Sequence, residues 1–161
     1  MEVLTFVPSK TILLISGLEV KGWNRISITR NAPAFIQIRG IRGKNTRTRV
    51  KDSSATVSIE CHQTEILHDV LSKCLEADIA AGNVRLEVML KEVAGNSFFN
   101  TTTAYITGFP EISFSDTLGT VTWTLACDES SFHIGGARNA AVGIVQDGVA
   151  RLKDFVSDIV N

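Results

Sequence analysis

The chain has few of the residues and motifs that would reveal a function directly. Its 161 residues include three cysteines and three prolines, and aromatic residues make up 7%. The cysteines (Cys61, Cys74 and Cys127) are widely spaced, and no CxxC motif is present. We therefore expect free, mostly buried thiols, with an intermolecular disulfide formed outside the cell as the alternative.

Long apolar runs are also absent. No stretch approaches the roughly 18 apolar residues of a membrane-spanning helix, and the first ten residues, MEVLTFVPSK, lack the basic start and apolar core of a secretory signal. We expect synthesis in a cytoplasm and no association with a membrane. Hydrophobic residues at 44% and charged residues at 20% are typical of one soluble globular domain and exclude general disorder.

The motifs of common catalytic and metal sites are missing. No G-x-S-x-G is present, and Cys61 and His62, as strand neighbours, would point to opposite faces. His62, His68 and His133 lack metal-ligand spacing. The segment 40–44 lacks the Walker spacing between its glycines. We expect no catalytic residue, cofactor or metal, and hence no enzyme.

What the chain has is a divided charge. The formal net charge is −1, but residues 1–51 hold ten cations and two acids, whereas residues 52–161 hold six cations and fifteen acids. The two parts therefore carry +8 and −9. This division excludes a uniformly basic nucleic-acid binder and favours a protein with two electrically opposite parts.

Alternation of apolar and polar residues, the period of a half-buried strand, recurs along the chain. It is found in Ile26–Thr29, Ala55–Cys61, Val84–Val88, Ile112–Ser115 and Val121–Leu125. Further candidate strands are Ile12–Ser16, Ala34–Arg39 and Thr103–Thr107. At least seven strands with polar connections predict a mainly β protein, an antiparallel β-sandwich or barrel.

Two segments have helical spacing instead. Residues 64–81 predict one flanking α-helix, with Thr64 as N-cap, Glu65 in the first turn and Gly82 at the C-terminal end. After residue 135 a second apolar stripe predicts a C-terminal amphipathic helical extension over 136–161. We expect a β domain of residues 1–135, and an extension that packs on its own sandwich or reaches outside it.

The region 40–52 concentrates positive charge and reads as a long loop or protruding hairpin. With the preceding arginine it holds six cations: Arg39, Arg42, Lys44, Arg47, Arg49 and Lys51. Alternation over 46–51 would place basic side chains on one side of an extended arm and small ones on the other. The cations could contact nucleic-acid phosphates, or form a solvated basic loop. Docking on the acidic part of a neighbouring copy fits the charge division better.

The order of these features resembles the phage tail tube proteins. The matching stretches lie between residues 10 and 135 and comprise GWNRISI at 22–28, TRVKD at 48–52, ATVSIE at 55–60, QT at 63–64, DVLS at 69–72, AYITGFPEI at 104–112 and TVTWTL at 120–125. One helix between pairs of strands, followed by the TVTWTL stretch, carries most of the likeness. The same family includes tubes of contractile tails, tailocins and type VI secretion systems.

The resemblance implies a self-assembling structural subunit of a virion tail. It implies six copies per ring, rings stacked into a hollow tube through which double-stranded DNA passes without specific binding, and contacts with tail sheath and baseplate proteins. It also implies that the loop 40–52 reaches a neighbouring subunit. The polar face of the Val84–Lys91 strand or of the Val121–Leu125 strand could line the lumen. The competing hypothesis is a β-sandwich that binds nucleic acid through Arg39–Lys51.

Overall fold

The computed structural model describes residues 10–136, and residues 1–9 and 137–161 lie outside that part. The predicted C-terminal helical extension is therefore outside the described residues. Within 10–136 the elements follow in this order: β1 (Thr11–Ile15), β2 (Leu18–Val20), β3 (Trp23–Arg30), β4 (Phe35–Arg39), β5 (Asn45–Arg49), β6 (Ala55–His62), α1 (Leu67–Ala81), β7 (Leu86–Glu92), β8 (Phe98–Ile106), β9 (Thr120–Cys127) and β10 (Ser131–His133).

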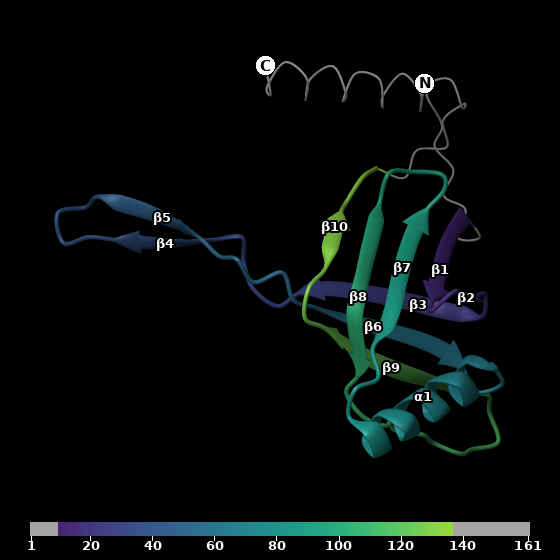
Figure 1. The fold of residues 1–161 in the computed structure, drawn as a ribbon. Coiled ribbons are helices and arrows are strands. Elements are labelled where there is room, and N and C mark those ends of the chain that lie inside the picture. Colours follow the sequence, from purple (N-terminus) through teal and green to yellow (C-terminus); the bar gives the residue numbers. More distant parts are fainter. Residues whose placement is uncertain (1–9, 137–161) are drawn as a thin grey trace, which may run out of the picture.

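Eight strands form one wrapped sheet in the order β2-β1-β7-β8-β9-β6-β3, with β10 paired to β8. All strand pairings are antiparallel, and β4 and β5 form a separate two-stranded sheet. Figure 1 shows the large sheet folded over itself, with α1 across its lower end and β4–β5 extending far from the body. The predicted antiparallel β-sandwich with one flanking helix is confirmed.

The core lies between the two halves of the folded sheet. Strand β6 buries Ala55, Val57, Ile59 and Cys61 in strict alternation, and β9 buries Trp123 and the other inward residues opposite them. Burying a large aliphatic or aromatic side chain contributes about 1.5–3 kcal/mol each. In these strands the apolar residues of the alternating pattern therefore form the face that points into the core.

Helix α1 closes one end of the sandwich through a single apolar face. Leu67, Leu71 and Leu75, spaced four residues apart, are its buried residues. At the other end of the helix Gly82 adopts a left-handed conformation (φ 75°) and its N–H donates to the Asp78 carbonyl at 2.6 Å. The predicted glycine C-cap is therefore confirmed.

The predicted start of this helix is wrong. The helix begins at Leu67, and the N-cap position is held by Ile66 without a side-chain hydrogen bond. Thr64 is exposed in the preceding turn, and the acid of the first turn is Asp69 rather than Glu65. The reason is tertiary: the neighbouring Gln63 accepts from the Gly119 N–H through its Oε1 at 3.2 Å, which ties this turn to another loop.

Most predicted strands are present, and several are longer than predicted: β3 begins three residues before Ile26, β7 ends four residues after Val88, and β8 begins five residues before Thr103. The exception is Ile112–Ser115, which lies in the long connection between β8 and β9 and forms no strand. This segment alternates apolar and polar residues but has no partner strand, and its Phe114 side chain remains 85% exposed. The short strands β2 and β10 were not predicted, because three residues carry too little periodicity to be recognised.

The cysteines and histidines have structural surroundings. Cys61 and Cys127 are buried free thiols and Cys74 is half-buried; burial raises the pKa of Cys61 to about 11 and that of Cys127 in the same direction. The predicted burial is confirmed for two of the three cysteines, and the intermolecular disulfide stays an alternative. The indole N–H of Trp123 donates to Nδ1 of His68 at 2.9 Å, and Nε2 of His68 lies 2.7 Å from the His62 carbonyl oxygen.

Within residues 10–136, no group of three or more metal-binding side chains is close enough to hold an ion. In the same range, no helix combines the length and apolar character needed to cross a membrane.

Candidate functional site

The most unusual feature of the described chain is the hairpin of β4 and β5, here called the arm (residues 31–53). Its strands pair from Phe35 with Arg49 to Arg39 with Asn45, and every residue of both strands is exposed. In the turn, Gly43 adopts a positive φ of 81° and its N–H donates to the Gly40 carbonyl at 2.9 Å. Figure 1 shows the arm reaching well beyond the sandwich.

Strand register gives the arm two different faces. Residues paired across an antiparallel ladder share a face, and alternate pairs point to opposite sides. One face carries Phe35, Gln37, Arg39, Asn45, Arg47 and Arg49. The other carries Ile36, Ile38, Thr46 and Thr48. The first is here called the cationic face and the second the apolar face.

The cationic face is internally ordered. The Arg47 guanidinium carbon lies 4.1 Å from the centre of the Phe35 ring, and Arg39 Nε donates to Asn45 Oδ1 at 3.0 Å. An exposed cation–π contact contributes about 0.5–1 kcal/mol. These contacts order a surface that would otherwise consist of freely rotating side chains.

The arm is fixed to the body at its root. The Asn31 N–H donates to the Ser54 carbonyl at 3.1 Å, the Asn31 Nδ2 to Ser54 Oγ at 3.1 Å, and Thr56 Oγ1 to Asn31 Oδ1 at 2.9 Å. On the other side, Arg30 Nη2 donates to the Ser130 carbonyl at 3.2 Å. The direction of the arm is therefore set by polar contacts with β6 and the β9–β10 connection.

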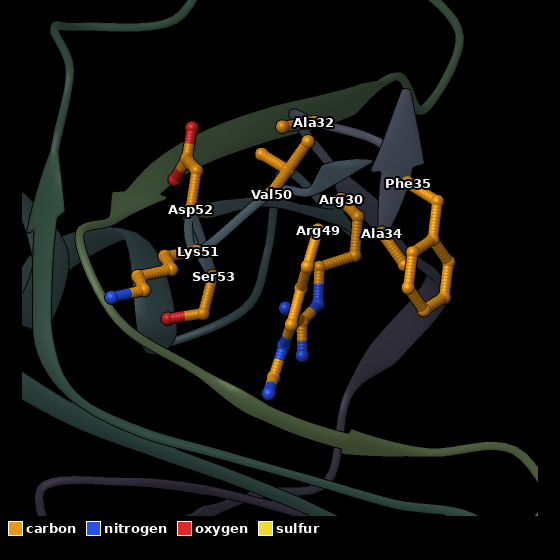
Figure 2. A pocket seen from close by; sticks show the side chains of 9 residues that line it. All are labelled: Arg30, Ala32, Ala34, Phe35, Arg49, Val50, Lys51, Asp52 and Ser53. Atoms are coloured by element: carbon orange, nitrogen blue, oxygen red, sulfur yellow. The ribbon is translucent and has the colours of Figure 1, made fainter. Parts of the chain in front are cut away.

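An open cavity of about 850 Å³ lies at this root. It is lined by Arg30, Ala32, Ala34, Phe35, Arg49, Val50, Lys51, Asp52 and Ser53. Figure 2 shows the Arg30 and Arg49 side chains extending in the same direction with the Phe35 ring beside them. The cavity thus presents three cations next to apolar atoms, which suits a carboxylate-bearing protein segment.

Asp52 is the one acid at the root cavity. The Ser54 N–H donates to Asp52 Oδ1 at 2.9 Å, and this bond, with a second from the Ser54 hydroxyl and the charge of Arg30, holds the pKa of Asp52 below its ordinary value. Figure 2 shows its carboxylate pointing away from Arg49. Asp52 therefore stabilises the turn and leaves the Arg49 cation available.

The six predicted contact residues occupy three parts of the arm. Arg39, Arg47 and Arg49 share the cationic face, Arg42 and Lys44 lie in the turn, and Lys51 lines the root cavity. The structure forms this region as a hairpin, one of the two forms that the sequence allowed, and the hairpin begins before residue 40 because Phe35–Arg39 is its first strand. A contact with a neighbouring subunit remains a prediction for all six.

The sequence reading missed the apolar face of the arm. Ile36 is 49% exposed and Ile38 is 60% exposed, and Ile41 at the tip is fully exposed. The signal was present, since Ile36 and Ile38 alternate with polar residues. The pattern predicts only a strand over Ala34–Arg39, and the isoleucines of a strand within the sandwich would face the core.

The chain is similar to a phage protein in sequence and to solved structures in fold. No protein-family model matches the chain. The structural protein ORF10 of Pseudomonas phage KPP10 is 26% identical over 143 residues, which cover 82% of this chain and 83% of that protein.

Two solved structures show the same fold at low identity. A chain of the virion of a native gene transfer agent particle aligns with a TM-score of 0.56 and 13% identity, over 81% of this chain and 100% of that chain. A chain of the sheath–tube complex of an extracellular contractile injection system aligns with a TM-score of 0.54 and 14% identity, over 80% and 91% of the two chains. The protein described here therefore has the fold of chains in a gene transfer agent virion and in the sheath–tube complex of a contractile injection system, and its sequence is similar to that of a structural protein of a phage.

Proposed function

We propose that this chain is a structural subunit of a phage tail tube, which assembles into hexameric rings that stack into a DNA-conducting channel. The observation that carries the proposal is the arm, an ordered hairpin with exposed cationic and apolar faces. A surface of this kind on a folded domain marks an interaction site. The relationship to a phage structural protein supports a structural role rather than catalysis.

The outward face of the β3–β6–β9 layer suits the lining of such a channel. Ser27, Ser58 and Thr124 lie side by side across the three strands, and in another row Arg25 lies opposite Glu60. This face is therefore rich in hydroxyls and close to neutral. Because a ring of six copies multiplies every charge, a neutral lining lets DNA pass without strong attraction. Of the two strands considered from the sequence, β9 is the better lining strand.

The outward face of β1 and β7 is less suitable. Leu14 pairs with Met89, and both side chains are half-buried outside the core. An apolar surface of this kind fits a contact with protein rather than a wet channel. In a contractile tail this side would face neighbouring subunits, a sheath or baseplate proteins.

Electron microscopy of the purified chain tests the proposal. At high protein concentration, negative-stain images are expected to show hollow rings or tubes, and class averages of end views are expected to have sixfold symmetry. A monodisperse monomer across all salt and protein concentrations would overturn the assignment. A ring with another symmetry would refute the hexamer and leave the tube role.

The arm's part in assembly is tested by the double variant Arg47→Glu/Arg49→Glu. Exposed charges contribute about 0–1 kcal/mol to stability, so the monomer should fold normally. Assembly should weaken, seen as a higher protein concentration at which tubes appear. The control variant, Lys21→Glu/Lys73→Glu, makes the same change in net charge on exposed body residues. Normal tubes from the arm variant would refute the docking role.

A nucleic-acid-binding module is less well supported. The arm has a single aromatic residue, Phe35, and Arg47 already covers its ring. Single-strand binding sites use exposed rings on which bases stack. If the arm bound DNA through phosphates alone, retention on a DNA column should fall steeply with salt. We expect no retention at physiological salt.

A further inference from the structure

The connection between β8 and β9, here called the 107–119 loop, is a second exposed surface that the proposed function does not use. Its exposed large apolar side chains are Phe109, Ile112, Phe114 and Leu118. The loop also carries two exposed acids, Glu111 and Asp116, and its sequence contains no Lys or Arg. Large apolar side chains interspersed with charges of one sign are typical of a protein-binding surface.

The body of the protein holds this loop in place. Gln63 donates through Nε2 to the Ser113 carbonyl, accepts from the Gly119 N–H at 3.2 Å, and donates its own N–H to the Gly119 carbonyl at 3.1 Å. The Phe109 ring lies 6.4 Å from the buried Trp123 ring. The surface is therefore ordered before any partner arrives, which lowers the entropic cost of binding.

The arm and the loop lie at opposite ends of β6. The arm leads into Ala55 at the start of β6, which pairs with Cys127, whereas the 107–119 loop ends at β9, whose first residue Thr120 pairs with His62 at the far end. Eight residues of strand separate the two ends by roughly 25 Å at about 3.3 Å per residue. Figure 1 shows the arm pointing away from the end where β9 begins.

The two surfaces are complementary. The arm has Ile36 and Ile38 on its apolar face and cations on the other face and at the tip, whereas the loop combines apolar side chains with acids. We propose that the arm of one copy docks on the 107–119 loop of the next copy, with its isoleucines against Phe114 and the turn cations Arg42 and Lys44 near Glu111 and Asp116. This proposal rests on the proposed function and names the surface that receives the arm.

The placement of the two surfaces limits the type of assembly. A contact between two different surfaces of identical chains closes into a ring or continues as a filament, unless two copies exchange arms reciprocally around a twofold axis. Because the arm points away from its own loop, each copy has one free donor and one free acceptor. This arrangement is what a growing tube requires.

Cysteine cross-linking between two versions of the chain tests the contact. Both versions carry Cys74→Ser, which leaves only the buried Cys61 and Cys127. One version adds Thr46→Cys on the apolar face of the arm, and the other, tagged to shift its mass, adds Ser113→Cys in the loop. The control replaces the loop cysteine by Ala80→Cys, an exposed position on α1. After mixing and mild oxidation, a non-reducing gel should show at least tenfold more mixed dimer for the arm–loop pair.

A charge exchange provides the second measurement. Glu111→Lys/Asp116→Lys alone should raise the concentration needed for assembly at least tenfold, as Arg42→Glu/Lys44→Glu alone should. The combined variant should return within about threefold of the unmodified chain, because opposite charges again face each other across the contact. Strictly additive losses would contradict the pairing.

The outcomes separate the two proposals. If the unmodified chain assembles but the arm–loop pair cross-links no better than the control, the docking contact is overturned and the tube function stands. If the unmodified chain never assembles, both are overturned. If Ser113→Cys becomes reactive to maleimide only after deletion of residues 137–161, the loop is covered by the chain's own C-terminal segment, which also overturns the docking contact.

Discussion

Strands β6 and β4 alternate apolar and polar residues in a similar way, yet they end in opposite environments. In β6, Val57 and Ile59 are fully buried between the layers of the sandwich, whereas in β4 Ile36 and Ile38 remain about half exposed. The difference is what lies opposite: β6 packs inside the folded sheet, whereas the two-stranded sheet of β4 and β5 extends beyond the body (Figure 1). An identical pattern therefore stabilises the monomer in one place and offers a binding surface in the other.

The largest effect that separates the two regions should come from the core. Leu125 in β9 is fully buried, so Leu125→Ala should destabilise the monomer by about 2–5 kcal/mol through lost burial and a residual cavity. Urea unfolding of the dilute monomer measures this change. The matched arm variant Ile38→Ala should change the free energy of unfolding by less than about 0.5 kcal/mol. If both variants lowered the free energy of unfolding equally, the arm would contribute to the stability of the monomer as the core does, which would contradict this comparison.

A smaller effect is expected at the one buried polar residue of the described core, Thr101. Its hydroxyl donates to the Glu129 carbonyl at 2.6 Å and accepts from the Thr103 N–H at 3.3 Å. Thr101→Val should cost about 1–3 kcal/mol, because the Glu129 carbonyl loses its shorter hydrogen bond and keeps only that from the Thr103 hydroxyl at 3.3 Å. Thr101→Ser retains the hydroxyl and should recover most of the loss. If serine and valine destabilise equally, packing rather than the hydrogen bond explains the cost.

Removal of the arm should affect the monomer still less. The Val50 N–H donates to the Ala34 carbonyl at 2.9 Å, which allows residues 35–49 to be replaced by a two-residue Asn-Gly turn. We expect a free energy of unfolding within about 1 kcal/mol of the full chain, since shortening a loop changes closure entropy only slightly. Assembly should be lost. Unfolding of the shortened monomer would show that the arm belongs to the core.

The smallest effect concerns order within the arm. Arg47→Ala removes the cation over the Phe35 ring and should speed hydrogen exchange of the arm amides by about two- to fivefold, equivalent to about 0.5–1 kcal/mol. Arg49→Ala, which pairs with Phe35 across the ladder, serves as the control. Equal changes in the two variants would indicate a general charge effect. NMR-detected exchange of the monomer provides the measurement.

The fold was predictable where a pattern matched its final environment. The alternation of β6 and β9, the leucine spacing of α1 and the glycine at its end all led to correct elements. Ile112–Ser115 misled because alternation says nothing about whether a partner strand is present. Thr64 misled because a cap residue is a local preference that the contacts of Gln63 override.

The candidate site was predictable in part for the same reason. Clustered cations are visible in any sequence, so the region 40–52 could be singled out as unusual before its shape was known. The apolar face of the arm and the 107–119 loop could not, because an isoleucine or phenylalanine is read as core until its exposure is measured.

By itself, the sequence determined the composition of each surface: a basic segment, acidic later strands, and the two periodicities that specify strands and one helix. Only the tertiary structure decided which alternating strands packed against an opposite layer of the sandwich. It also placed the arm and the 107–119 loop at opposite ends of β6. The physical reason is that hydrophobic burial depends on what lies opposite a side chain, and that partner is distant in sequence and is brought there only by the fold.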